Sequence, residues 1–386
     1  MSPNTVDVNS PRSLSAAIYL GVIGAAVFIV QPGFVQGLVG FYGFSEQQAG
    51  YIASAEIWGL ALTTVLLALG GHRVRWRRVL KTSIIVFALG NVAAVFTQDF
   101  TLFSGMRFVA GMGSGGLVSL TFTIIGLTQR ADHNFGYLIM GVLSYGALGL
   151  WIMPWALEIA GMHGVIIFFA MFGFSGWPFI AHMPDSGKEQ RQVEADALDL
   201  SGLFRWCAII AMFTYFFAQG VIWAYLFLIG TNGGVSAQGV ANGLMLSQFL
   251  GIVGAFVPAL LGNRYGRIFP LTIGIIGGSI VLYALFGEFT AMVYAVTVCI
   301  YNFFWNMTHP FLLAAMASFD QHGRVVVYAV AAQMLGLAVG PAFAATLLEG
   351  ADYARIITAG IILFIVSWLL MLVPLINHRR QSAVLP

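Results

Sequence analysis

Charged residues are scarce in this chain of 386 residues. Asp, Glu, Lys and Arg make up 8% of it, whereas hydrophobic residues make up 59% and the mean hydropathy is +0.88. Soluble domains carry about 25% charged residues, so a fold in water could not bury this much apolar surface, and lipid must be the solvent. The net charge of +2 is too small to indicate a nucleic-acid partner.

Cysteine is also rare, and both residues, Cys207 and Cys299, lie in apolar runs. This pattern excludes a disulfide framework and a zinc site. No short apolar region ends in a small-residue cleavage site, so we expect no signal peptide. The sequence also lacks paired acids, a His-rich cluster and a nucleophile with a nearby base. We therefore expect no enzyme activity, no resident metal and no cofactor.

Long apolar runs fill most of the chain. A spanning helix needs about 20 predominantly apolar residues. Twelve runs of about this length can be marked, at about 14–41, 46–70, 80–97, 101–128, 135–158, 163–183, 203–230, 238–262, 268–287, 290–318, 325–348 and 354–377. The polar segment 184–202 holds seven of the 32 charges and divides these runs six and six. The sequence therefore predicts an all-α membrane protein, with a six-helix bundle at 1–183, a cytoplasmic linker at 184–202 and a second six-helix bundle at 203–386.

The distribution of Lys and Arg predicts which side each loop faces. With the N-terminus inside, fifteen of these residues fall on the inner side and only Arg355 on the outer side, while Arg107 lies within a span. Cytoplasmic loops of membrane proteins carry the excess of positive charge. We therefore expect both termini in the cytoplasm of a multi-pass protein of the inner (plasma) membrane.

Two loops half the chain apart carry similar sequences. The loop at 68–78 reads A-L-G-G-H-R-V-R-W-R-R, and the loop at 260–267 reads L-L-G-N-R-Y-G-R. His72 and Asn263 occupy matching places, 191 residues apart. Within the fourth run, Arg107 opens the stretch R-F-V-A-G-M-G-S-G-G. Two parallel six-helix repeats with a substrate site near the bilayer midplane are a known transporter design.

These motifs resemble those of the major facilitator superfamily, over essentially the full length of the chain. The loop pattern of that family, G-x-L-A-D-R-x-G-R-R, has an acid where this chain has His72 and Asn263, and a glycine where it has Arg75. The resemblance implies a bacterial secondary transporter, with twelve helices in two pseudo-symmetric bundles around a central cavity. The fifth run lacks the G-P-x-x-G-G signature of the family's antiporters, which favours uptake over efflux. The predicted gating residues in the two loops are Arg73, Arg77, Asn263, Arg264 and Arg267.

Ionisable residues inside spanning helices are functional candidates, because lipid disfavours them. Three stand out in this sequence, namely Glu56, Arg107 and His309. Glu56 and Arg107 lie in helices that enter from the same side, at depths that differ by about one helical turn, so their side chains can meet. We interpret Glu56 as a proton-coupling acid beside Arg107, with a permanent ion pair as the alternative. His309 titrates near neutrality and is the second coupling candidate.

Polar and aromatic side chains recur along the run at 290–318. Asn302, Trp305, Asn306 and His309 fall at i, i+3, i+4 and i+7, which predicts one shared helical face. Such a face avoids lipid, so it either lines a cavity or bonds to a neighbouring helix. We favour the cavity, because the resemblance to the family implies that this helix lies beside the central cavity. The other predicted substrate-binding residues are Gln31, Arg107, Tyr145, Tyr215, Gln219 and Trp223.

The sequence as a whole predicts a secondary active transporter that works by alternating access and proton-coupled uptake. Ligand sites are mostly apolar with a few polar groups, and one cation beside one acid suits a small organic anion or an amphipathic or aromatic compound. Proton-coupled efflux and a non-transporting assembly protein of the same fold are the alternatives. The expected partners are the solute, a proton and the lipid bilayer, with the chain acting as a monomer.

Overall fold

The computed structural model describes residues 6–70, 74–186, 198–262, 264–321, 324–348 and 352–382. Within these ranges the regular structure consists of thirteen α-helices and two short 3-10 helices, without a strand. The chain divides into two compact units, Met1–Gln190 and Arg191–Pro386.

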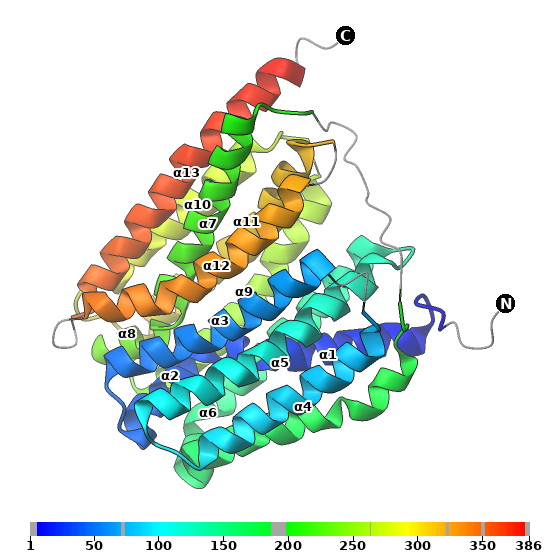
Figure 1. Cartoon of the computed structure of the whole chain (residues 1–386). Coiled ribbons are helices and arrows are strands. Elements are labelled where there is room, and N and C mark those ends of the chain that lie inside the picture. The colour runs from blue at the N-terminus through cyan, green and yellow to red at the C-terminus, as the bar shows by residue number, and fades with distance from the viewer. Residues whose placement is uncertain are drawn as a thin grey trace. The chain divides into compact units, whose positions relative to one another are not determined.

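The first unit contains α1 (Pro11–Ile29), α2 (Gln31–Tyr42), α3 (Glu46–Gly70), α4 (Trp76–Val95), α5 (Phe100–Gly126), α6 (Ala131–Ser175) and the 3-10 helix η2 (Trp177–His182) (Figure 1). The run expected at 14–41 is broken at Val30, and Pro32 stands in the first turn of α2. Proline is tolerated at such a start because its missing N–H would have no partner there. The runs expected at 135–158 and 163–183 share the label α6, but the backbone leaves helical geometry at Gly161, where φ is 62° and ψ is −175°, so two helices meet there, between the two expected runs.

The second unit contains α7 (Gly202–Trp223), α8 (Leu226–Asn232), α9 (Ala237–Leu261), α10 (Ile268–Val281), the 3-10 helix η3 (Leu282–Leu285), α11 (Ala291–Ser318), α12 (Arg324–Leu347) and α13 (Ala354–Ser382) (Figure 1). The run expected at 203–230 consists of two helices, because α7 ends at Trp223 and α8 begins at Leu226. The other expected runs each correspond to one α-helix, and η3 extends α10.

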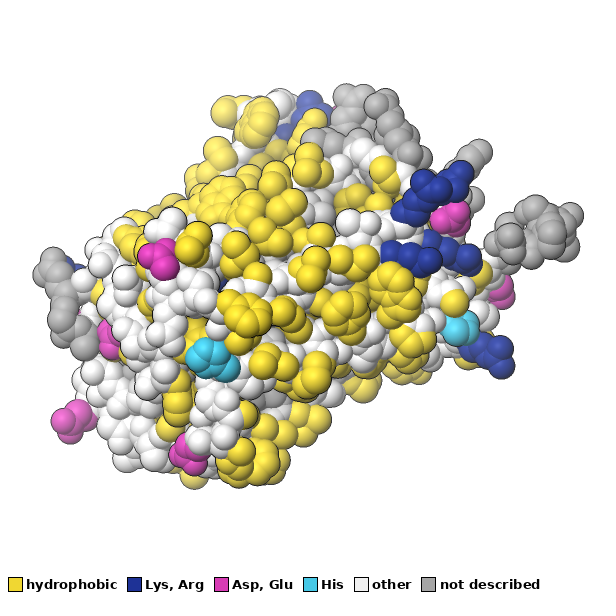
Figure 2. All heavy atoms as spheres, turned by 60° about the horizontal axis from the view of Figure 1, so that its bottom comes forward, with side chains coloured by type: hydrophobic (Ala, Val, Ile, Leu, Met, Phe, Trp, Pro, Cys, Tyr) yellow, Lys and Arg dark blue, Asp and Glu magenta, His cyan; other side chains and the backbone are white. Residues whose placement is uncertain are grey.

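Ten helical segments of the described chain are long and apolar enough to cross a membrane. One of them, His133–His182, is 50 residues long and covers two of the expected runs. Helix α11 has 28 residues but is not among the ten, and it carries the polar residues at 302–309. Large apolar side chains are exposed on many helices. On the face drawn in Figure 2 hydrophobic side chains form broad patches, and most of the Lys and Arg side chains that it shows lie toward the right of the view. A multi-pass membrane protein requires this apolar outer surface.

Glycines let α3 and α5 approach each other closely in the first unit. A Cβ atom at Gly111 would overlap the backbone carbonyl of Glu56, and one at Gly59 would overlap the carbonyl of Phe108. Small residues permit such backbone contact between membrane helices. Because Gly111 lies one turn after Arg107 on the same helix face, this contact also fixes the depth of Glu56 relative to Arg107.

The two ends of the expected linker are hydrogen-bonded to neighbouring elements. In the first unit, the Trp76 N–H donates to the carbonyl oxygen of Asp185 at 2.9 Å, and Arg77 Nε donates to that of Met183 at 2.5 Å. In the second unit, the Leu198 N–H donates to the carbonyl oxygen of Ser318 at 2.9 Å. The middle of the linker, 187–197, lies outside the described residues. Each end of the linker therefore belongs to the unit that it adjoins.

Candidate functional site

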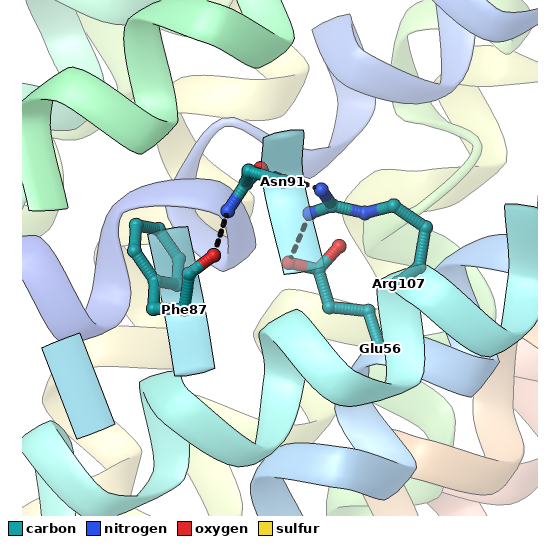
Figure 3. Close-up of polar contacts among 4 residues, drawn as sticks. All are labelled: Glu56, Phe87, Asn91 and Arg107. Carbon is teal, nitrogen blue, oxygen red and sulfur yellow. Dashed lines mark hydrogen bonds and ion pairs between the residues drawn. The ribbon is translucent and has the colours of Figure 1, made fainter. Parts of the chain in front are cut away.

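Three helices of the first unit bring a buried polar cluster together, and Figure 3 shows it. Arg107 of α5 donates from Nη2 to Oε1 of Glu56 on α3, at 2.5 Å. It also donates from Nη1 to Oδ1 of Asn91 on α4, at 2.6 Å. Arg107 and Asn91 are fully buried, and Glu56 is 6% exposed. The structure therefore joins two residues that the sequence placed at similar depths, and it adds a third.

Asn91 is absent from the residues predicted from the sequence. Its Nδ2 atom donates to the carbonyl oxygen of Phe87, one turn earlier in α4, at 2.8 Å (Figure 3). This bond leaves the amide oxygen facing Arg107, whose guanidinium can only donate. The signal that could have identified Asn91 is an amide inside the apolar run I-I-V-F-A-L-G-N-V-A-A-V at 84–95, because polar side chains within spans are candidates in the same way as Glu56.

The short helix α2 contributes a ring to this cluster. The centre of the Phe34 ring lies 4.8 Å from Cζ of Arg107, which is within the range of a cation–π contact. The Nε atom of Arg107 is buried and has no hydrogen-bond partner in the described structure. Gln31, a predicted site residue one turn before Phe34, is buried as well, and its Oε1 atom also has no partner there. The Nε–H group of Arg107 therefore donates no hydrogen bond to a described residue.

The charges of this cluster balance when Glu56 is ionised. Arginine stays protonated at any accessible pH, and an unpaired charge within a span is costly. No other described acid forms an ion pair with Arg107. When Glu56 accepts a proton, the guanidinium loses its counter-charge. The net charge of the cluster, and with it the cost of leaving Arg107 without an anion beside it, therefore depends on whether Glu56 holds a proton.

A second set of polar contacts connects α7 with α11 in the second unit. Gln219 Nε2 donates to the hydroxyl of Tyr215 at 3.0 Å, and Gln219 Oε1 accepts a hydrogen bond from the hydroxyl of Tyr301. Each of the three residues is about 1% exposed. Tyr215 and Gln219 are among the predicted residues. Tyr301 was missed, although it stands four residues before Trp305 and its hydroxyl needs a partner inside a span.

The predicted polar residues of α11 divide between neighbouring helices. Asn302 Nδ2 donates to the carbonyl oxygen of Ser247 on α9 at 3.0 Å, and Asn306 Nδ2 donates to Oδ1 of Asn302 at 2.8 Å. Trp305 instead packs edge-to-face against Trp223 of α7, with ring centroids 5.4 Å apart. The amides therefore bond toward α9, whereas the indole rings join α11 to α7.

His309 is bonded to the next helix in the chain. Its Nε2 atom lies 3.0 Å from Oε1 of Gln333 on α12. Its ring centroid is 5.0 Å from that of Phe216 on α7. Because the amide oxygen can only accept, this contact assigns the proton to Nε2. The described contacts of His309 include no acidic side chain.

The remaining predicted residues lie apart from these contacts. Tyr145 stacks on Phe172, and both belong to α6, with ring centroids 5.2 Å apart. Arg264 is exposed and Arg267 is partly exposed at the start of α10. Two predicted gating residues, Arg73 and Asn263, lie outside the described residues. Among the side chains that the structure describes, no group of three or more His, Cys, Asp or Glu could hold a metal ion.

Comparison with known proteins gives a consistent result. Residues 16–341 match the family model described as Major Facilitator Superfamily. The chain is 24% identical over 284 residues to an uncharacterized MFS-type transporter of Yersinia pestis (strain Pestoides F), which covers 67% of this chain and 70% of that protein. It is 23% identical over 171 residues to a putative niacin/nicotinamide transporter, NiaP, of Bacillus subtilis (strain 168), covering 43% and 41% of the two chains.

The fold is similar to that of a solved transporter. The structure of the xylose transporter XylE from E. coli, in a partially occluded inward-open conformation, superimposes with a TM-score of 0.70. The superposition covers 93% of this chain and 96% of that one, at 15% sequence identity. At this identity the similarity concerns the fold alone.

Proposed function

Because this chain belongs to the Major Facilitator Superfamily, and is therefore a transporter and not an enzyme, we propose that it moves a small organic solute by proton-coupled alternating access. The names of the matched relatives, for niacin or nicotinamide and for xylose, support a small organic solute. We place the protein in the bacterial plasma membrane, as its Yersinia and Bacillus relatives suggest.

A count of twelve spans is supported by three features of the described helices. Ten segments qualify by length and composition. The segment His133–His182 is long enough for two spans, with the break at Gly161 between them. Helix α11 has the length of a span, and its polar side chains bond to other helices instead of facing lipid. The excess of basic residues on one side of these spans favours cytoplasmic termini.

The observation that carries the coupling proposal is the buried Glu56–Arg107 ion pair. A permanent charge next to a titratable acid allows proton and anion to load together, because protonation of Glu56 frees the guanidinium. For a neutral solute, Arg107 would act only through its effect on Glu56. The apolar rings and amides around Trp223, Trp305 and Gln219 are suited to a ring-bearing or amphipathic solute.

The test is uptake into proteoliposomes under an imposed pH gradient. A solute is first identified by its stabilisation of the purified protein, since a ligand that binds the native state raises the unfolding midpoint. Glu56→Gln mimics the protonated acid, so we expect this variant to bind the solute and exchange it across the membrane but not to accumulate it. Glu158→Gln removes an exposed acid of α6 and should accumulate the solute normally.

Normal accumulation by Glu56→Gln under a pH gradient would show that Glu56 is not the coupling acid. His309→Gln would then be the next variant to measure. Accumulation driven by the opposite gradient direction would instead assign the chain to efflux.

A further inference from the structure

A hollow in the first unit lies between α3 and α4 and is floored by α5. Its cavity volume is about 560 Å³. It forms because α3 and α4 both pack against α5, and it lies at the end of the unit where α4 begins. Among the described residues, the polar lining consists of Thr63, Arg75, Arg78, Thr82 and Ser83, none of which is acidic.

The basic residues near the start of α4 divide between two sides of the helix. Arg77 is bonded to the Met183 carbonyl, and the Lys81 ammonium lies 5.8 Å from the centre of the Trp177 ring. Arg75 and Arg78 line the hollow instead, are exposed, and form no ion pair with a described residue. Arg77 and Lys81 therefore contact other parts of the first unit, whereas Arg75 and Arg78 present to the hollow two positive charges that no described acid neutralises.

The hollow becomes less exposed away from the arginines. The Oγ1 atom of Thr63 is buried and has no hydrogen-bond partner among the residues that the structure describes, and Ser83 is 6% exposed. The rest of the lining is apolar and consists of Val74, Val79, Val86, Met112 and Gly113. Guanidinium and hydroxyl groups both donate hydrogen bonds to phosphate oxygens, and an apolar wall accommodates an acyl chain.

We propose that this hollow binds a phosphate ester, with the phosphate at Arg75 and Arg78, and that its ligand is an acidic phospholipid whose hydrophobic part follows the apolar wall. Each Lys or Arg next to the membrane surface raises the affinity for an anionic lipid about fivefold. None of the lining residues belongs to the Glu56–Arg107–Asn91 cluster. The proposal is therefore independent of proton coupling and of the transported solute.

The test uses the full-length purified protein, delipidated in neutral detergent. Its unfolding midpoint is followed while short-chain phosphatidylglycerol, phosphatidylcholine or inorganic phosphate is added. The stabilisation grows with ligand concentration and gives an apparent Kd. Arg75→Gln/Arg78→Gln removes both charges of the hollow, and Thr63→Val removes the buried hydroxyl. Arg379→Gln/Arg380→Gln is the matched control, because it removes two exposed charges at the end of α13.

We expect phosphatidylglycerol to stabilise the wild type more than phosphatidylcholine does. Its apparent Kd should rise about thirtyfold in Arg75→Gln/Arg78→Gln and about tenfold in Thr63→Val, and stay unchanged in the control. Equal stabilisation by inorganic phosphate, lost in the same variants, would assign the site to a soluble phosphate compound. Equal effects of the two lipids, or an unchanged Kd in Arg75→Gln/Arg78→Gln, would overturn the proposal.

Discussion

At the scale of single residues, Asn91 has both ends of its amide bonded in a position that water does not reach. Leucine has a similar volume but cannot accept a hydrogen bond, so Asn91→Leu would leave Nη1 of Arg107 without this acceptor. An unmatched donor of a buried charged group costs about 2 kcal/mol or more. We expect Asn91→Leu to lower the unfolding midpoint in detergent and to reduce the maximal transport rate.

The control for this prediction is Asn242→Leu, which changes an exposed amide on α9 and should alter neither quantity. If Asn91→Leu folds stably and transports at the wild-type rate, Asn91 does not position Arg107. A variant with low stability but a normal rate per folded molecule would assign Asn91 a structural role only.

The sequence identified the charged members of the cluster but not all of its polar members. Glu56 and Arg107 could be predicted as partners because ionisable residues within spans are rare and their depths follow from helix geometry. Asn91 and Tyr301 are also polar residues within apolar runs, but they are uncharged and therefore less conspicuous in the sequence. The contact between Phe34 and Arg107 could not be predicted, because 32 phenylalanines make any one of them inconspicuous and Phe34 lies in a helix that begins only after the break at Val30.

At the scale of helices, the contact between α3 and α5 depends on Gly111. A methyl group there would overlap the Glu56 carbonyl, so Gly111→Ala must push the two backbones apart. Overpacking of this kind costs about 1–3 kcal/mol, and it would also lengthen the Glu56–Arg107 ion pair. We expect a lower unfolding midpoint and impaired proton-driven accumulation, measured on the same purified protein.

Gly105 supplies the matched control within the same helix. A Cβ atom there would meet nothing within 4 Å, so Gly105→Ala should be neutral or stabilise α5 by up to about 1 kcal/mol through helix propensity. Equal behaviour of the two variants would show that the close approach at Gly111 does not control the pair.

The positions of helices followed from apolar runs more reliably than the breaks within them. The run expected at 290–318 corresponds to α11 at Ala291–Ser318, although its polar residues lower its hydropathy. The break near Trp223 was not predicted, because hydropathy does not report backbone geometry. The break between the runs expected at 135–158 and 163–183 was predicted, and it falls at Gly161, where the backbone angles are not helical.

At the scale of the whole molecule, the charge distribution predicts the orientation in the membrane. In a Cys207→Ala/Cys299→Ala background, single cysteines can replace Glu288 and Arg380, which are both exposed. We expect a membrane-impermeant thiol reagent to label Glu288→Cys in intact cells and Arg380→Cys only after permeabilisation. Basic residues stay on the cytoplasmic side during insertion. Labelling of Arg380→Cys in intact cells would reverse the assigned topology.

The family was recognisable from sequence because its loop and helix motifs depend on local spacing. Arg107 and the following glycines, and the loop arginines at 264 and 267, are short-range patterns. Solute recognition depends instead on side chains that are distant in sequence, such as Gln219 and Tyr301. Their pairing is set by helix packing, so a single sequence predicts the transporter class without predicting its solute.

The hydrogen bonds at the two ends of the linker would both be retained if the chain were cut between residues 190 and 191. A fragment that ends at 190 keeps the acceptors of Trp76 and Arg77 at Asp185 and Met183. A fragment that begins at 191 keeps the bond between Leu198 and Ser318. Each half therefore keeps its own hydrogen bonds at the linker, and the two units could be encoded as separate chains without losing them.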